Sequence, residues 1–129
     1  MKKIVFILTM IFMPVGHANA APMALDTVKL IINSTKASWI AYRDYNGLQW
    51  IYFTHLEGWK CGIAEVKYGI NEADLDQIWE LETCNPDNPI AITKDIIYLT
   101  FPLDTVQTID VQLTFDDGTT TDVERFVKP

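Results

Sequence analysis

Apolar and polar positions alternate over several short stretches of this chain, with turn-forming residues between them. Alternation with a period of two predicts strands that bury one of their faces. Such strands are expected at 28–32, 64–70, 96–101, 109–115 and 119–127. With the hairpin described next, the chain should hold seven or eight short strands and no long helix.

The clearest local signal is the dipeptide Asn46-Gly47, which lies between aromatic and β-branched runs at 37–45 and 48–56. Asn-Gly favours a two-residue type I′ turn, because both turn positions need a positive φ. The predicted hairpin pairs Tyr45 with Leu48, and alternation then sorts its side chains onto two faces. The expected core face carries Ile40, Tyr42, Ile51, Phe53 and His55. The opposite face carries Trp39, Arg43, Tyr45, Trp50 and Tyr52.

The remaining segments add turns and short elements. Residues 71–74 predict one capped helical turn, and 77–83 predict a short strand after a turn. Turn-forming residues fill 85–89. This pattern predicts an all-β fold, a small antiparallel immunoglobulin-like β-sandwich, with helix in less than about 10% of residues. A small closed β-barrel is the alternative.

The first twenty residues predict export. Lys2 and Lys3 precede an apolar run from Ile4 to Met13, and Ala18-Asn19-Ala20 offers the small residues that a signal peptidase recognises. The apolar run is about half as long as the roughly 20 residues that a membrane-spanning helix needs. We therefore expect residues 1–20 to be a signal peptide and residues 21–129 to form a single domain in the periplasm or outside the cell.

Cys61 and Cys84 are the only cysteines of the chain. Two cysteines in a small exported domain usually form a disulfide bond, because the compartment is oxidising. Neither lies in a Cys-x-x-Cys motif, which disfavours a redox role. The sequence thus predicts a structural bond between Cys61 and Cys84.

The charge of the chain restricts its partners. It has 17 acidic and 10 basic residues, and two of the basic ones are Lys2 and Lys3, so residues 21–129 carry a formal charge of −9. A surface of this sign repels nucleic acid and anionic lipid head groups. It suits a basic protein partner, and it also serves solubility alone.

Few side chains of the chain could act as a nucleophile or a general base, and no catalytic residue is assigned. His55 is the only histidine in 21–129, and Ser34 and Ser38 are the only serines. The hairpin register would place Ser38 across from His55, so a hydrolase that uses this pair is a distant alternative. No Gly-x-Ser-x-Gly elbow surrounds either serine.

No metal site and no cofactor are expected. One histidine and two paired cysteines cannot supply the ligands of a zinc site. Two groups of carboxylates lie at short spacing, namely Asp116, Asp117 and Asp122, and Glu72, Asp74 and Asp76. Neither group matches the calcium-loop motif.

The aromatic side of the hairpin predicts a binding surface. Exposed Trp and Tyr side chains beside an arginine are typical of such patches. The first hypothesis is an interaction module that binds a protein partner through Trp39, Arg43, Tyr45, Trp50 and Tyr52. The second is a carbohydrate- or glycan-binding module that stacks sugars on the same aromatic rings. Arg43 is expected to stack on the indole of Trp50, its cross-strand neighbour.

Overall fold

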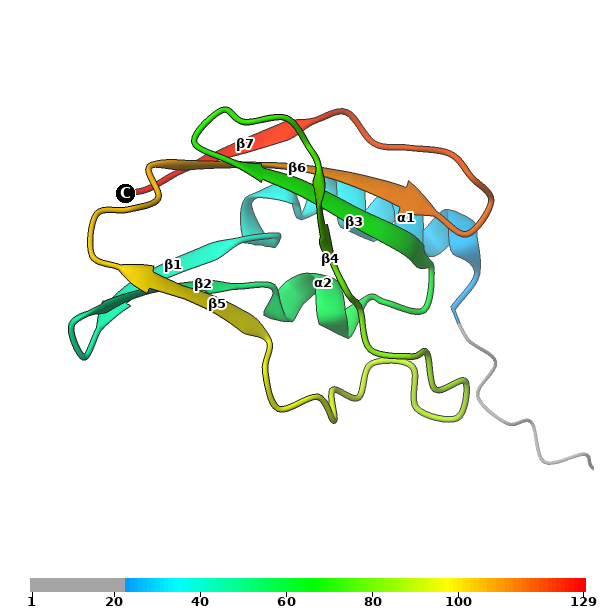
Figure 1. Cartoon of the computed structure of the whole chain (residues 1–129). Coiled ribbons are helices and arrows are strands. Elements are labelled where there is room, and N and C mark those ends of the chain that lie inside the picture. Colours follow the sequence, from blue (N-terminus) through cyan, green and yellow to red (C-terminus); the bar gives the residue numbers. More distant parts are fainter. Residues whose placement is uncertain (1–22) are drawn as a thin grey trace, which may run out of the picture.

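The computed structural model describes residues 23–129, which form two antiparallel sheets and three short helices (Figure 1). Sheet A has the order β1-β2-β5, with β1 at Ala41–Tyr45, β2 at Leu48–Tyr52 and β5 at Tyr98–Pro102. Sheet B has the order β4-β3-β6-β7, with β4 at Gln77–Trp79, β3 at Ile63–Ile70, β6 at Thr108–Phe115 and β7 at Glu124–Val127. The helices are α1 (Leu25–Ser34), the 3₁₀-helix η1 (Lys36–Ser38) and α2 (Thr54–Gly58).

The seven strands confirm the predicted small all-β, sandwich-like fold. Within residues 23–129 neither sheet closes on itself, so the closed barrel is excluded. The core lies between the sheets, where Ile51 from β2 and Val66 and Leu113 from sheet B are fully buried. Phe53 stacks on Trp79 with ring centroids 4.2 Å apart and planes 1° apart, which joins the end of β2 to β4. Ile40, Ile51 and Phe53 of the hairpin face that was expected to be core are buried, and Tyr42 is half-buried. His55 was expected on the same face, but it lies in α2 and is only half-buried.

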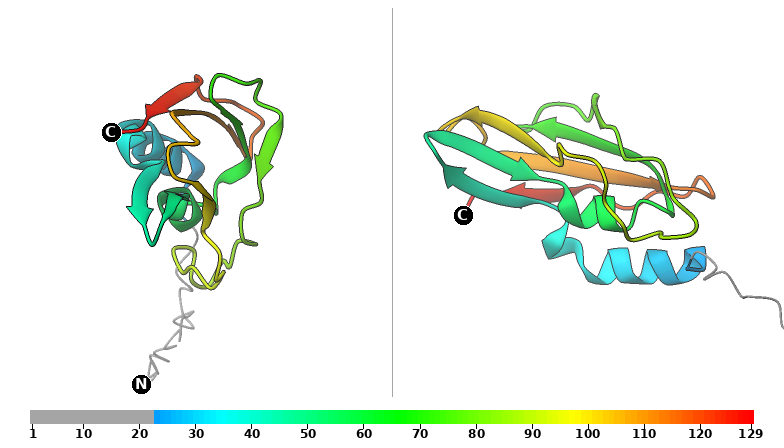
Figure 2. Two further views of the ribbon diagram at one scale, coloured as in Figure 1. Left: turned by 60° about the vertical axis from the view of Figure 1, so that its left-hand side comes forward. Right: turned by 90° about the horizontal axis from the view of Figure 1, so that it is seen from below.

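Residues 28–32 are helical, and the prediction of a strand there is wrong. Val28 and Ile32 lie one helical turn apart and are both buried, whereas Leu30 is 70% exposed. Val28 and Ile32 thus share the buried side of the helix, and Leu30 lies on its exposed side. The helix α1 runs along the sandwich next to α2 (Figure 2). The two α-helices hold 10 and 5 of the 107 described residues, which exceeds the expected helix content.

The hairpin forms around Asn46-Gly47, whose φ angles are 52° and 74°. The register pairs Tyr45 with Leu48, Arg43 with Trp50 and Ala41 with Tyr52, as predicted. The ladder ends at that last pair, because η1 occupies Lys36–Ser38 on one side and α2 begins at Thr54 on the other. Trp39 therefore does not pair with Thr54, and Ser38 is not a cross-strand neighbour of His55.

Residues 70–73 form a reverse turn and not the predicted helical turn. Asn71 and Glu72 have φ angles of 53° and 65°, and the Ala73 N–H donates to the Ile70 carbonyl at 3.1 Å. The turn makes β3 and β4 an antiparallel hairpin. A Cβ atom on Gly69 would lie 2.4 Å from the Ala73 carbonyl oxygen, so only glycine permits this close approach.

The segment 80–97 joins β4 to β5 without a helix or strand, and residues in and just after α2 hold it in place. The predicted disulfide bond between Cys61 and Cys84 is present. The fully buried carboxylate of Glu57 accepts hydrogen bonds from the Trp79 indole at 2.9 Å and from the Glu82 N–H at 3.1 Å. These contacts replace the regular backbone pairing that the segment lacks.

The predicted signal peptide, residues 1–20, lies outside the described residues. Within residues 23–129, both α-helices are too short to cross a membrane.

Candidate binding face

Four aromatic side chains meet on the outer side of sheet A, and we call them the aromatic face: Tyr45, Trp50, Tyr52 and Tyr98. Trp50 lies in the central strand β2, between Arg43 on β1 and Thr100 on β5. Side chains of a strand alternate between its two faces, so burial of Ile51 turns Trp50 and Tyr52 outward. Tyr98 joins them because β5 pairs with β2 and places it opposite Tyr52.

The inner side of β2 is fixed by Gln49, whose side chain is completely buried. Its amide nitrogen donates to the Val106 carbonyl at 2.8 Å, and its amide oxygen accepts from the Val106 N–H at 2.9 Å. Both polar atoms are thus satisfied, which offsets the cost of burying them. This pair of hydrogen bonds holds β2 in the orientation that leaves Trp50 outside.

Trp50 is the centre of the aromatic face. Its ring centroid lies 4.6 Å from that of Tyr98, 6.4 Å from that of Tyr45 and 6.5 Å from that of Tyr52. The indole N–H donates to the Tyr45 carbonyl at 2.9 Å, which fixes the ring orientation. Trp50 and Tyr52 are half-buried and Tyr45 is 54% exposed, so the four rings form one continuous aromatic surface.

Trp39 does not belong to this surface, in contrast to the prediction. Its side chain is fully buried, and its indole N–H donates to the Ile32 carbonyl at 3.0 Å. The ring packs on Phe126 with centroids 6.1 Å apart. The backbone at Trp39 is α-helical, with φ −60° and ψ −40°, so the alternation of the hairpin does not extend to it.

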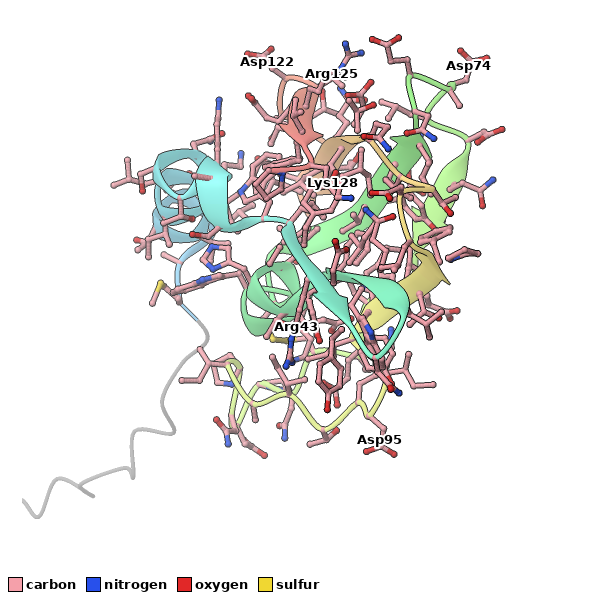
Figure 3. All side chains as sticks on the ribbon, turned by 90° about the vertical axis from the view of Figure 1, so that its left-hand side faces the viewer. Arg43, Asp74, Asp95, Asp122, Arg125 and Lys128 are labelled. Carbon is pink, nitrogen blue, oxygen red and sulfur yellow. A yellow bond between two sulfur atoms is a disulfide. The ribbon has the colours of Figure 1, made fainter. Side chains whose placement is uncertain are left out.

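Arg43 stacks on Tyr45 and not on Trp50, because its guanidinium carbon lies 4.2 Å from the Tyr45 ring centroid. The other basic residues of 23–129 each have a carboxylate within 4.0 Å: Lys29, Lys36, Lys60, Lys67, Lys94, Arg125 and Lys128. Arg43 is the one basic side chain in this range without such a partner. Figure 3 shows it far from Arg125, which lies at the opposite end of the view.

A hollow of about 690 Å³ adjoins the aromatic face where β1 and β2 meet the helices. Its walls come from η1, β1, β2 and the start of α2: Ser38, Ala41, Tyr42, Arg43, Tyr52, Thr54 and His55. Tyr52 belongs both to the aromatic face and to this wall. Ser38 and Thr54 are both exposed, and no hydrogen bond of either hydroxyl group is found within the described residues.

His55 is half-buried and lies against the hydroxyl group of Thr35. The Thr35 hydroxyl donates its single hydrogen to the Ile31 carbonyl at 2.7 Å and lies 2.8 Å from Nε2 of His55. Burial lowers the pKa of His55 from its ordinary value of 6.5, so the ring is neutral at pH 7.

Ser38 and His55 line the same hollow, but no hydrogen bond joins them among the described residues. The Nε2 atom of His55 is occupied by Thr35. A serine nucleophile needs a base within hydrogen-bond reach, so the hydrolase alternative stays a prediction that no contact between these two side chains supports.

Two of the six carboxylates that were considered as calcium ligands, Asp117 and Glu72, form ion pairs. Asp117 pairs with Lys29 and accepts from Thr119, and these contacts lower its pKa to about 2. Glu72 pairs with Arg125 at 2.8 Å. Residues 23–129 contain no cluster of three His, Cys, Asp or Glu side chains that is arranged to hold a metal ion.

Searches of family models, curated proteins and solved structures find no match to this chain. The aromatic face and the adjoining hollow are therefore the features that bear on its function.

Proposed function

We propose that this chain is a non-catalytic binding module that contacts a protein partner through the outer side of sheet A. The observation that carries the proposal is the aromatic face, which is continuous across β1, β2 and β5 and has Arg43 at its border. Trp, Tyr and Arg supply most of the binding energy at protein interfaces. Contacts within the face already hold Trp50, so little side-chain freedom is lost on binding.

A glycan is the second candidate ligand, and the hollow is the observation that favours it. Hydroxyl groups of Ser38 and Thr54 lie beside the ring of Tyr52, as in sites that stack and hydrogen-bond a sugar. Ionic strength separates the two candidates. Protein binding assisted by charge weakens as salt rises, whereas sugar stacking does not.

Replacement of Trp50 tests the proposed face. Trp50→Ala should weaken partner binding by about 2 kcal/mol or more if the ring is a hot spot, at little cost to stability. Ile78→Ala is the control, because Ile78 is an exposed apolar residue of sheet B, 52% accessible. The partner is first captured with the protein as bait and then purified. Calorimetry then measures its affinity for each variant.

Trp39→Ala is the reference for the loss of a buried tryptophan. Loss of this buried ring should lower the free energy of unfolding by roughly 3–5 kcal/mol. If Trp50→Ala destabilises the protein as much as Trp39→Ala does, Trp50 is a core residue and the binding face is refuted. Urea denaturation of both variants gives this comparison.

We also propose that the chain is exported and that its mature form begins at Ala21. Support comes from the apolar run, from Ala18-Asn19-Ala20 and from the disulfide bond, which suits an oxidising compartment. The intact mass of the protein recovered from the cell envelope or the medium should lack residues 1–20. A mass that retains them overturns the proposal.

A further inference from the structure

We propose that the hollow beside the aromatic face binds a carboxylate group of the protein partner, with Arg43 as its counter-ion. This inference rests on the proposed function and adds the chemistry of the group that is recognised. It stands on three features of the described residues: an unpaired guanidinium, a wall without acidic residues and two open hydroxyl groups.

The unpaired guanidinium is exceptional in this chain. Acidic residues outnumber basic ones by 17 to 10, and every other basic side chain of residues 23–129 has a carboxylate partner. Arg43 instead lies over the Tyr45 ring at 4.2 Å, which restricts its motion while its N–H groups stay free. A guanidinium presents these donors in a planar fork that matches the two oxygens of a carboxylate.

The wall of the hollow carries no negative charge. None of its seven residues is acidic, although the chain is rich in Asp and Glu. Ser38 and Thr54 each offer a hydroxyl donor, and His55 is neutral at pH 7. A carboxylate that enters the hollow thus meets donors and one cation without a like charge on the wall.

The local and the overall charge select different features of a partner. The formal charge of −9 on residues 21–129 favours a basic partner at long range. The group that contacts Arg43 is nevertheless acidic, because charge complementarity at contact fixes register and specificity. The partner is therefore expected to place an Asp or Glu side chain, or its C-terminal carboxylate, at the border of the aromatic face.

Nuclear magnetic resonance titration of the ¹⁵N-labelled protein tests this assignment. The probes are N-acetylglutamic acid α-amide for a side-chain carboxylate and N-acetylglycine for a terminal one, with N-acetylglutamine amide and N-acetylglycine amide as their neutral counterparts. We expect one of the acids to shift the Arg43 Nε–Hε signal and the backbone amide signals of Ser38 and Thr54, with no effect from its neutral counterpart. The acid that binds more tightly identifies the source of the carboxylate.

Two variants with the same change in charge complete the experiment. Arg43→Gln should weaken binding of the acid roughly tenfold. Lys67→Gln should leave it unchanged, because Lys67 lies on β3 in the other sheet. Equal losses in both variants, or equal shifts by acid and amide, overturn the proposal.

Glucuronate is the third arm of the titration. If it binds Arg43 more tightly than either amino-acid probe, the hollow is assigned to an acidic sugar and the protein carboxylate is refuted. Failure of every acid, combined with loss of partner binding in Trp50→Ala, refutes the hollow and leaves the proposed function standing.

Discussion

Trp39 and Trp50 differ in role although both belong to the same aromatic segment of the sequence. The indole N–H of each is satisfied by a backbone carbonyl, from Ile32 for Trp39 and from Tyr45 for Trp50. The difference is the direction in which each ring leaves the backbone. Trp39 is helical and points between α1 and β7, whereas Trp50 is in a strand and points outward.

His55 makes the stability of the protein depend on pH. Its pKa in the folded state is lowered by burial, so the unfolded state binds a proton more readily. The free energy of unfolding should therefore be fully maintained above pH 6.5 and should decrease as the pH falls below that value. His55→Gln should lack this decrease between about pH 6.5 and 5, before most carboxylates titrate.

Urea denaturation at a series of pH values measures this effect. His55 is the only histidine of residues 21–129, so it should account for the whole change near pH 6. An unchanged pH profile in the His55→Gln variant would assign the acid sensitivity to another group.

At the level of elements, the five-residue helix α2 organises a segment much longer than itself. Glu57 binds Trp79 and the backbone of Glu82, and its carboxylate lies 3.4 Å from Lys94 Nζ. Lys60 donates to the Ala91 carbonyl at 2.6 Å. The helix thus fixes the path of 80–97 and, through it, the point at which β5 enters sheet A.

Removal of the Glu57 carboxylate should release this segment. Glu57→Ala leaves the Trp79 indole N–H and the Glu82 N–H without acceptors and removes a buried partner of Lys94, which should cost roughly 3–5 kcal/mol of unfolding free energy. Faster hydrogen exchange in 80–97 should accompany the loss.

Glu65→Ala is the matched control, because that carboxylate is 40% exposed and pairs with Lys67 at the surface. It should change stability and exchange very little. Unaltered exchange of 80–97 in Glu57→Ala would show that the segment is held by other contacts.

The whole molecule combines two open sheets with one covalent link. The Cys61–Cys84 bond joins positions 23 residues apart, and it ties the loop between α2 and β3 to the irregular segment. The aromatic face lies on β1, β2 and β5, and none of these strands contains a cysteine. Stability and binding should therefore respond differently to loss of the bond.

Reduction of the disulfide, or the double variant Cys61→Ser with Cys84→Ser, should lower the free energy of unfolding by roughly 3.5 kcal/mol in the chain-entropy model. Ligand binding should persist at temperatures below the reduced melting temperature. Calorimetric melting with and without reductant, followed by a binding measurement at a temperature where the reduced protein is still folded, measures both. Loss of binding while the protein remains folded would place the disulfide in the site.

Patterns in the amino-acid sequence were enough to predict the features that depend on local geometry. Asn46-Gly47 has the positive φ angles that set the hairpin register, and alternation placed Ile51 and Phe53 in the core. The disulfide followed from the number of cysteines and the expected compartment. These features need only neighbouring residues, or a pair with no alternative partner.

Features that depend on contacts between distant residues became visible only in the folded protein. The apolar residues at 28–32 fit a helix as well as a strand, and the segment forms a helix that buries Val28 and Ile32. Trp39 is buried because Phe126 and α1 surround it, and Tyr98 reaches the aromatic face because β5 pairs with β2. Arg43 remains unpaired because no carboxylate of the described residues lies within 4.0 Å of its guanidinium, and the neighbouring Asp44 pairs with Lys128. Burial and charge pairing depend on which segments meet in space, and one-dimensional patterns do not record that.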